Sequence, residues 1–263
     1  VHGKTLSYNN YNDILSALTI SKSLPKNKGV VIVKHANPCG VSVLKNNLDC
    51  YKNALACDPK SAFGGIVSCN FRMKKSLALE LNKIFLEVII ANGFEKSALE
   101  ILKLKKNLRI IDASNFSFNE FLKFNSINNS MLIQSEDNQI FTKNNFKVVS
   151  KKKPNKSQFE NLILAFNLCR YVKSNAIVLV SNMSTVGIGS GQPSRLDSCK
   201  IAISKMNQFS RKKDEIVAAS DAFFPFVDGI EQLVQSGISA VIQPAGSIRD
   251  KEIIKFANDT GTI

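Results

Sequence analysis

The sequence places two side chains that can bind protons or anions next to each other, Lys34 and His35, at the end of a short, mostly apolar run. The run at 29–34 (GVVIVK) is rich in β-branched residues and predicts a buried strand. Ligands in open α/β sheets collect at the carboxyl ends of strands, which is where this pair falls. There a histidine can accept a proton, and a neighbouring ammonium group can bind an anion or stabilise an oxyanion. The alternative is a histidine that only caps a turn, and position alone leaves the two interpretations even.

Three further motifs could bind a ligand. The segment 187–191 (GIGSG) precedes an expected helix and could hold a phosphate with backbone N–H groups, although a plain tight turn is the stronger interpretation. The aromatic run 223–226 (FFPF) is ordinarily core. It could also form a wall for a flat heterocycle, with Asp228 accepting hydrogen bonds from amino groups. Asn175, just before an expected strand, could orient a substrate or His35.

Apolar periodicity places these residues in an α/β fold. The elements predicted for the first half are a strand at 29–34, a turn at 35–40, a helix through Leu48, Tyr51 and Leu55, a helix at 73–85, a strand at 88–90, a helix at 96–105 and a strand at 108–111. Those predicted for the second half are a helix at 157–172, a strand at 176–180, a helix from Pro193, a helix at 230–235, a strand at 241–242 and a helix at 250–258. Such alternation is typical of a layered α/β fold with a largely parallel sheet.

The sequence predicts a boundary near residue 147. Between 113 and 146 the pattern loosens, with possible short strands at 131–133 and 139–141. On either side of this region the order strand, polar turn, helix and Ala-Phe motif recurs. We therefore expect two copies of one α/β unit, at 1–147 and 148–263, whose turns face a shared cleft.

Composition narrows the class of protein. The chain has 263 residues and a formal net charge of +14. Only 6 of the 35 basic residues are Arg and the lysines are scattered, so a solvated basic surface that attracts small anions is favoured over a nucleic-acid interface. Six cysteines form no Cys-x-x-Cys pair, which argues against a zinc site and a disulfide framework and for reduced thiols in the cytoplasm. The sequence shows no membrane-spanning run and no signal peptide, and a first residue that is Val indicates a piece of a longer protein.

Eight stretches of sequence are recognisable together. They are HGKTLSYNNYND (2–13), VIVKHANPCGVS (31–42), DPKSAFGGIVSCN (58–70), EVIIANG (87–93), VKSNAIVLVSN (172–182), TVGIGSGQPSRLDS (185–198), ASDAFFPFVDGI (219–230) and AVIQPAGSIRD (240–250). In this order they resemble the AICAR transformylase region of the bacterial AICAR transformylase/IMP cyclohydrolase family. The resemblance runs over nearly the whole chain and thins only at about 112–147.

The resemblance implies transfer of a formyl group from 10-formyltetrahydrofolate to the 5-amino group of 5-aminoimidazole-4-carboxamide ribonucleotide (AICAR), in de novo IMP biosynthesis. It implies two tandem cytidine-deaminase-like α/β subdomains that work without zinc, and a homodimer with shared active sites. In the family, the residue matching His35 accepts the proton, and those matching Lys34 and Asn175 are also catalytic. By the same matching, the nucleotide-binding residues are Gly64, Glu87 and Phe223, and the folate-binding residues are Arg195, Pro225, Asp228, Ser247 and Ile248.

The sequence also departs from the family pattern. Some relatives have Asp where this chain has Glu87, and relatives usually have Arg where it has Val227, which reduces the charge beside the folate residues. An Arg-Tyr stretch before His2, an Arg-containing tail after Ile263 and the IMP cyclohydrolase domain are absent, so no cyclohydrolase activity is expected. Two alternatives stay open: a non-catalytic basic α/β module that binds nucleic acid or an acidic partner, and a truncated remnant that folds but does not turn over.

Overall fold

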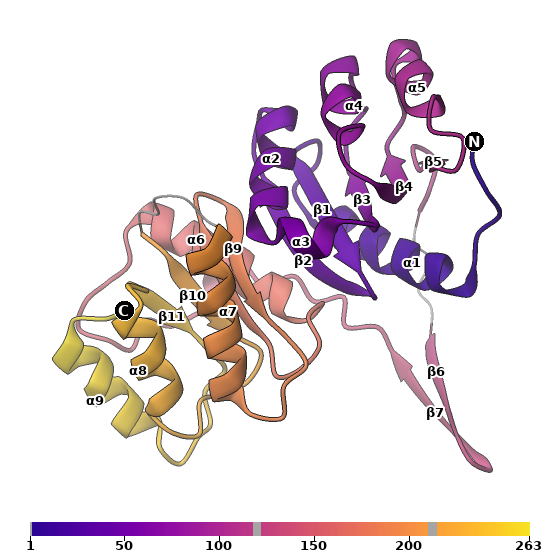
Figure 1. The fold of residues 1–263 in the computed structure, drawn as a ribbon. Helices are drawn as coiled ribbons and strands as arrows, with labels where there is room; N and C mark the ends of the chain where they lie inside the picture. The colour runs from indigo at the N-terminus through magenta and orange to yellow at the C-terminus, as the bar shows by residue number, and fades with distance from the viewer. Residues whose placement is uncertain (1, 118–121, 210–214) are drawn as a thin grey trace.

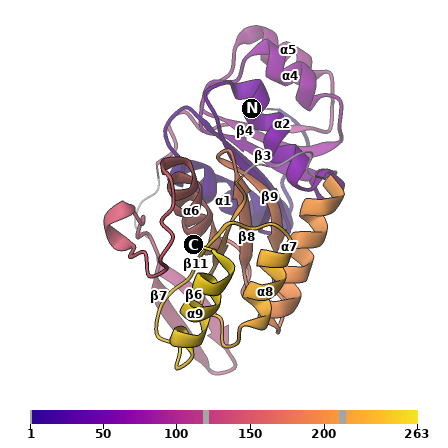
Figure 2. The same cartoon turned by 90° about the vertical axis from the view of Figure 1, so that its left-hand side faces the viewer.

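One continuous β-sheet runs through the chain in the computed structural model, which describes residues 2–117, 122–209 and 215–263 (Figures 1 and 2). The elements before the middle of the chain are α1 (Tyr8–Ser23), β1 (Gly29–Lys34), β2 (Asn37–Val43), α2 (Asn47–Cys57), α3 (Pro59–Ala62), β3 (Gly65–Cys69), α4 (Lys75–Leu81), β4 (Leu86–Ala91), α5 (Lys96–Lys103) and β5 (Arg109–Asp112). The middle holds β6 (Leu122–Ile127), β7 (Ser130–Ser135) and the 3-10 helix η1 (Lys143–Asn145). The remaining elements are α6 (Lys156–Cys169), β8 (Ile177–Ser181), β9 (Ser184–Gly189), α7 (Arg195–Phe209), β10 (Val217–Ser220), α8 (Asp228–Gln235), β11 (Ala240–Ile242) and α9 (Asp250–Thr260).

The sheet joins both halves of the chain. Within the described residues its nine strands lie in the order β11-β10-β8-β9-β2-β1-β3-β4-β5. The pairs toward the two ends, β3–β4, β4–β5 and β10–β11, are parallel, while the hairpins β1–β2 and β8–β9 are antiparallel. The predicted α/β class is confirmed, but the sheet is mixed and not largely parallel. The reason is that both hairpins close through two-residue turns, and so short a connection can join only antiparallel strands.

Helices cover both faces of the sheet (Figure 2). Successive side chains of a strand point to opposite faces of the sheet, so neighbouring residues of one strand pack into different hydrophobic cores. In β1, Val31 and Val33 pack into the core under α1 and α6, whereas Val30 and Ile32 pack into the core under α2, α4 and α5. On the same side as α2, helices α7, α8 and α9 cover the strands of the second half. The sheet is therefore the middle layer of three.

The turns of the two central hairpins have left-handed backbones. Residues 35–36 and 182–183 have φ values between 48° and 58°, as tight two-residue hairpin turns favour. The sequence predicted a turn over 35–40, but β2 begins at Asn37 and includes Pro38. Proline is tolerated there because the β1–β2 register shifts at a bulge opposite this position.

The glycine-rich segment 187–191 is not the tight turn that the sequence predicted. Its first three residues lie in β9, where α7 crosses so closely that a Cβ atom on Gly189 would lie 1.9 Å from the carbonyl oxygen of Ser198. Gly40 in β2 has the same relation to α2, because a Cβ atom there would lie 1.9 Å from the carbonyl oxygen of Ala54. Glycine is needed at both positions for the close approach of helix and strand.

The middle of the chain forms a separate two-stranded hairpin (Figure 1). The expected strand at 131–133 lies in β7, but its partner is β6. The expected strand at 139–141 was wrong. Its last residue, Phe141, instead exchanges backbone hydrogen bonds with the side-chain amide of Asn167, both at 2.9 Å.

Candidate active site

The end of β1 carries the pair that the sequence singled out. Lys34 is half-buried, and its Nζ donates hydrogen bonds to the carbonyl oxygens of Phe63 and Gly64, both at 3.0 Å. An ammonium group has three donors, so these two bonds leave one. Gly64 has a φ of +67°, and a Cβ atom there would lie 3.0 Å from Nζ. Glycine at 64 thus allows the close approach that anchors the lysine.

An aspartate from α1 holds the turn that presents His35. Asp13 accepts hydrogen bonds from the backbone N–H of His35 at 3.3 Å and of Ala36 at 2.7 Å. The imidazole of His35 is exposed. Asp13 was not among the predicted site residues. It lies in the stretch 2–13 that matched the family, but a contact across 22 positions leaves no pattern in a single sequence.

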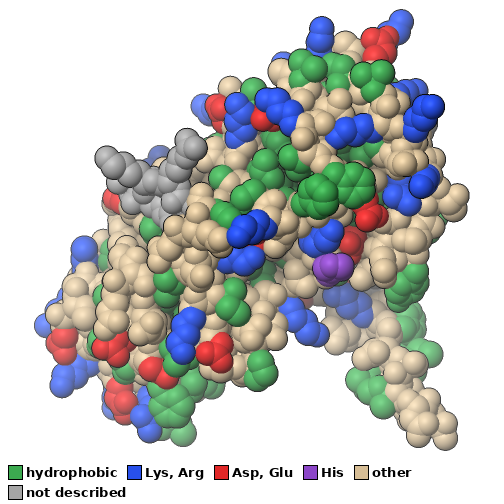
Figure 3. Space-filling model, in the orientation of Figure 1, with side chains coloured by type: hydrophobic (Ala, Val, Ile, Leu, Met, Phe, Trp, Pro, Cys, Tyr) green, Lys and Arg blue, Asp and Glu red, His purple; other side chains and the backbone are tan. Residues whose placement is uncertain are grey.

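Two exposed aromatic rings lie beside Lys34. Phe63 and Phe85 expose 62% and 49% of their surface, and their ring centroids are 5.4 Å apart. Figure 3 shows hydrophobic side chains gathered on this face near α3 and β3, and Lys and Arg side chains spread over the whole face. Neither phenylalanine was among the predicted site residues, although Phe63 directly precedes Gly64, which was.

A cross-half ion pair fixes the helix that leads to Phe63. Asp58 is the N-cap of α3 and accepts hydrogen bonds from the backbone N–H and Oγ of Ser61 at 3.0 and 2.5 Å. It also forms an ion pair with Lys205 of α7. Burial alone raises the pKa of the Asp58 carboxyl, but Lys205 and Ser61 lower it below its ordinary value. A charged Asp58 therefore ties the loop that anchors Lys34 to the second half.

The expected nucleotide residue Glu87 lies on the same sheet edge as Lys34. It accepts a hydrogen bond from Nδ2 of Asn10 at 2.8 Å and lies 3.7 Å from Nη1 of Arg109. This edge contains the carboxyl end of β1 but the amino ends of β3 and β4, because β1 runs antiparallel to β3. The sequence argument assumed parallel strands, and this assumption fails here because β1 runs antiparallel to its neighbour β3.

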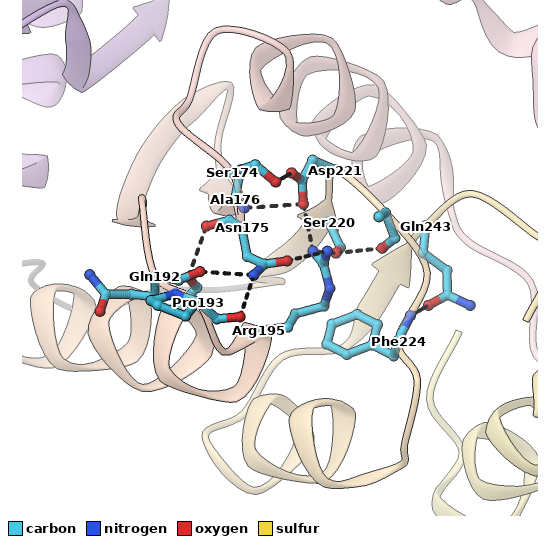
Figure 4. A network of polar contacts seen from close by, with 12 residues as sticks. Ser174, Asn175, Ala176, Gln192, Pro193, Arg195, Ser220, Asp221, Phe224 and Gln243 are labelled. Atoms are coloured by element: carbon cyan, nitrogen blue, oxygen red, sulfur yellow. Dashed lines mark hydrogen bonds and ion pairs between the residues drawn. The ribbon is translucent and has the colours of Figure 1, made fainter.

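Asn175 lies in a second cluster, two residues before β8 (Figure 4). Its Nδ2 donates to the carbonyl oxygens of Gln192 at 2.8 Å and Pro193 at 3.0 Å, and its Oδ1 accepts from Nη2 of Arg195 at 2.5 Å. Both hydrogens of the amide are thus used within the second half. Asn175 is placed to shape the loop before α7, and its Oδ1 keeps one lone pair.

Arg195 is the centre of this cluster (Figure 4). Its Nη1 donates to Oγ of Ser220 at 2.7 Å and forms an ion pair with Oδ1 of Asp221 at 2.5 Å, with 10% and 18% of the two charged side chains exposed. Asp221 also accepts from Oγ of Ser174 at 2.5 Å and from the backbone N–H of Ala176 at 3.1 Å. Burial raises the pKa of Asp221, but these donors together lower it below its ordinary value.

The other expected folate residues lie next to this cluster, on the loops before α8 and α9 and at the first position of α8. Phe223 is 40% exposed, whereas Phe224 is buried and donates its backbone N–H to Oε1 of Gln243 at 2.8 Å (Figure 4). That bond joins the loop before α8 to the loop before α9. The expected residues Pro225, Asp228 and Ile248 are exposed, and Ser247 is half-buried.

Asn37 connects the first cluster to the second half. Its Nδ2 donates to the carbonyl oxygen of His35 at 3.1 Å. Its Oδ1 accepts from the backbone N–H of Lys173 at 3.0 Å and from Oγ of Ser190 at 3.4 Å. The structure thus shows two clusters, one around Lys34 and one around Arg195, with Asn37 bridging from the His35 turn to the loops beside the second.

No group of three His, Cys, Asp or Glu side chains that could hold a metal ion occurs among the described residues. In the same part of the chain, no helix combines the length and the apolarity needed to cross a membrane.

Comparison with known proteins matches the model of the AICARFT/IMPCHase bienzyme family to residues 1–205. Among curated proteins, the chain is 43% identical over 263 residues to the bifunctional purine biosynthesis protein PurH of Persephonella marina. It is 44% identical over 262 residues to PurH of Bacillus cereus strain AH187 and 40% identical over 260 residues to PurH of Chlorobium phaeobacteroides. These matches cover 98–99% of this chain and 50% of each relative, so the chain spans about half the length of these proteins.

Proposed function

Because the chain belongs to the AICARFT/IMPCHase bienzyme family, we propose that it is the formyltransferase part of a purine biosynthesis bienzyme. It transfers a formyl group from 10-formyltetrahydrofolate to the 5-amino group of AICAR. The motif series from VIVKHANPCG to SDAFFPF supports this half over the cyclohydrolase half. A division into two cytidine-deaminase-like units near residue 147 belongs to the proposal. The order helix, hairpin, helix, strand, which occurs on both sides of that point, supports it.

The observation that carries the proposal is the turn at the end of β1. His35 is exposed on a turn whose two N–H groups are bound by Asp13, so a proton acceptor stands at a fixed and accessible place. Lys34 beside it keeps one donor beyond the two that bind carbonyl oxygens. The amine of AICAR is a poor nucleophile because its lone pair is delocalised toward the carboxamide, so a base and a cation at the reacting atoms are what the transfer needs.

In this reaction the amine nitrogen bonds to the formyl carbon, and the bond from that carbon to N10 of the folate breaks. His35 accepts the amine proton, and a proton is returned to N10 as it leaves. Lys34 stabilises the oxyanion of the tetrahedral intermediate. A positioned base contributes about 10²–10⁴-fold in rate, and holding both substrates together supplies a further part.

The nucleotide binds along the sheet edge beside Lys34. Gly64 and Glu87 lie on this edge, and Phe63 and Phe85 offer exposed ring faces on which a flat heterocycle can stack. The basic surface of the chain favours the approach of an anionic nucleotide.

The folate binds at the second cluster. Pro225 and Ile248 lie exposed on two loops joined through Gln243, Ser247 lies half-buried on the second of them, and Asp228 is the exposed first residue of α8. The guanidinium of Arg195 uses three of its five N–H groups on Asn175, Ser220 and Asp221, which leaves two for a ligand. Phe223 contributes to the nucleotide site from the second half of the chain. The proposal also includes a homodimer with shared sites, which the resemblance to the family implies.

The test is His35→Ala in the complete protein, with His2→Ala as the matched control. We expect kcat for formyl transfer to fall by about 10²–10⁴-fold, while the urea midpoint and AICAR affinity stay close to those of the parent. The control should retain the parent kcat. A His35→Ala enzyme that turns over within about threefold of the parent, well short of the contribution of a general base, would remove His35 from the proposed role.

A further inference from the structure

Helix α7 makes polar contacts near both of its ends. Its first residue, Arg195, is the centre of the second cluster, where the folate is proposed to bind. Lys205 follows about 15 Å further along the helix, and it was not among the predicted site residues. Its Nζ forms an ion pair with Asp58 and donates a hydrogen bond to Oγ of Ser61 at 3.4 Å. The helix that begins in the folate cluster therefore also contacts the short helix α3 of the first half.

The ion pair lies where a charge needs its partner. The side chain of Asp58 is only 7% exposed, and that of Lys205 is 32% exposed. A buried carboxylate that loses its counter-ion must become protonated or turn toward water. Asp58 is the residue on which α3 is built, because its carboxylate caps Ser61 and its carbonyl oxygen accepts from the backbone N–H of Ala62 at 3.1 Å. A helix of four residues depends on such contacts, so the loss of Lys205 should displace α3.

The end of α3 holds the ammonium group of Lys34. The helix ends at Ala62, and the carbonyl oxygens of the next two residues, Phe63 and Gly64, are the acceptors for Nζ. A lysine ammonium lies on a flexible stem, so its direction is set by the groups that it binds. The exposed ring of Phe63, paired with Phe85, leaves the chain at the same point. Helix α3 thus positions both the cation and one ring of the proposed nucleotide site.

A second contact joins the same two helices. Lys60 of α3 places its Nζ 5.6 Å from the ring centroid of Phe209, the last residue of α7. Lys60 is exposed, and a cation–π contact at an exposed site is weak. Removal of one partner from a buried ion pair costs more. Of these two links, the pair formed by Lys205 and Asp58 is therefore the one that fixes α3 on α7.

We infer that Lys205 is a positioning residue of the nucleotide site. Through Asp58 and α3 it fixes the ammonium group of Lys34 and the ring of Phe63. The inference rests on the proposed function for the role of Lys34. It deepens that function by assigning part of the nucleotide site to a helix of the second half.

The inference predicts a separation of kinetic effects. Loss of Lys205 should change kcat, through Lys34, and the KM for AICAR, through Phe63. The KM for the folate should not follow, although Arg195 lies on the same helix. Three side chains of the second half hold the guanidinium of Arg195 independently of α3.

The experiment compares three variants of the complete protein with the parent. Lys205→Met removes the cation and keeps an unbranched side chain. Lys205→Met with Asp58→Asn leaves no buried charge unpaired, and asparagine still caps a helix, so α3 stays capped but is no longer tied to α7. Lys200→Met is the matched control, because it lies on the same helix and breaks only an exposed pair with Asp197.

We expect kcat for formyl transfer to fall about tenfold or more in the single and the double variant, as the misplacement of a catalytic group does. The KM for AICAR should rise about three- to tenfold, the worth of one aromatic contact. The KM for 10-formyltetrahydrofolate should stay close to that of the parent. The control should match the parent in all three quantities, and the double variant should match it in urea midpoint.

Acetylation of amines without substrates gives a readout that does not depend on the reaction. The Nζ of Lys34 is held by two carbonyl oxygens, so N-hydroxysuccinimidyl acetate should label it slowly in the parent. In both Lys205→Met variants the labelling of Lys34 should be about fivefold faster, the factor that corresponds to one net hydrogen bond. Mass spectrometry of the peptide that contains Lys34 measures the rate.

A double variant that keeps kcat within about threefold of the parent, short of the effect of a misplaced group, would overturn the inference. Labelling of Lys34 at the parent rate would also overturn it. So would a KM for the folate that rises as much as the KM for AICAR, because α7 as a whole would then have moved. If His35→Ala leaves turnover intact while Lys34 is labelled faster in the Lys205→Met variants, the proposed function fails and the positioning by Lys205 stands.

Discussion

The substitution Asp221→Asn should destabilise the fold severely. Asp221 is the carboxylate partner of Arg195, and both side chains are largely buried, with 18% and 10% exposed. The change removes the negative charge while leaving the guanidinium in place. It also places an amide, which has only one oxygen, where two oxygens accept hydrogen bonds from Arg195, Ser174 and Ala176. Breaking a buried pair by removing one partner costs about 3–5 kcal/mol, and the residual exposure of Asp221 favours the lower end.

The control for this prediction lies on the same helix as Arg195. Asp197 and Lys200 form an exposed pair at 3.6 Å, with 53% and 57% of the side chains exposed. Exposed pairs contribute about 0–1 kcal/mol, so Asp197→Asn should leave stability nearly unchanged. Urea unfolding followed by circular dichroism measures both variants. A loss of about 3 kcal/mol also lowers Tm by roughly 6–12 °C.

The pH dependence of this difference has a definite sign. The pKa of Asp221 is lowered in the folded protein, so the stability from its charged form is present above the unfolded pKa of about 3.9. It is lost as the pH falls through the lower, folded pKa. The gap in unfolding free energy between parent and Asp221→Asn should therefore be full near neutral pH and close below about pH 4. A gap below about 1 kcal/mol at neutral pH, no larger than that of an exposed pair, would refute the reasoning.

Three further predictions follow from contacts described above. Gly189→Ala should destabilise the protein by about 1–3 kcal/mol or more, because its Cβ would meet the backbone of Ser198 at 1.9 Å; an unchanged urea midpoint would contradict this. Phe63→Ala with Phe85→Ala should weaken AICAR binding about tenfold in calorimetry, the worth of one or two aromatic contacts, with little change in stability; unchanged affinity would exclude stacking. Burial raises the pKa of Cys39 to about 12, so its thiol should react slowly with a disulfide reagent at pH 8 until urea is added, and fast labelling of the native protein would count against it.

Local elements with strong periodicity could be predicted from the sequence. The β-branched run of β1 and the helices α2, α5, α6 and α9 lie where the pattern placed them, within a few residues at their ends. Helix α1 was missed because its buried face includes the polar residues Asn10 and Ser21, which interrupt the apolar period. Both are bound inside the fold, Asn10 to Glu87 and Ser21 to Ser68 at 2.8 Å each. Their partners are 77 and 47 residues away, beyond the reach of a local pattern.

The sequence indicated which residues belong to the candidate site, but not which side chains contact one another there. Lys34 and His35 could be singled out because they lie at the end of a recognisable strand. Asp13 could not, since a carboxylate that binds a turn 22 residues later has no sequence signature. The predicted turn, 35–40, is longer than the observed one. Its two residues, His35 and Ala36, are not the Asn-Gly or Asp-Gly pair that usually indicates a tight hairpin.

The meeting of β2 and β9 has a consequence for how the chain folds. The two strands face each other at Ser42 and Ser184, whose hydroxyl groups are 2.7 Å apart across 142 positions of sequence. The hairpins on either side close loops of two residues, and the entropic cost of closing a loop increases with the length of the loop. Each half should therefore acquire its strands before the halves join, and the seam should form late. A Ser184→Ala substitution should accordingly act on the unfolding rate and leave the folding rate almost unchanged, as expected for contacts absent from the transition state.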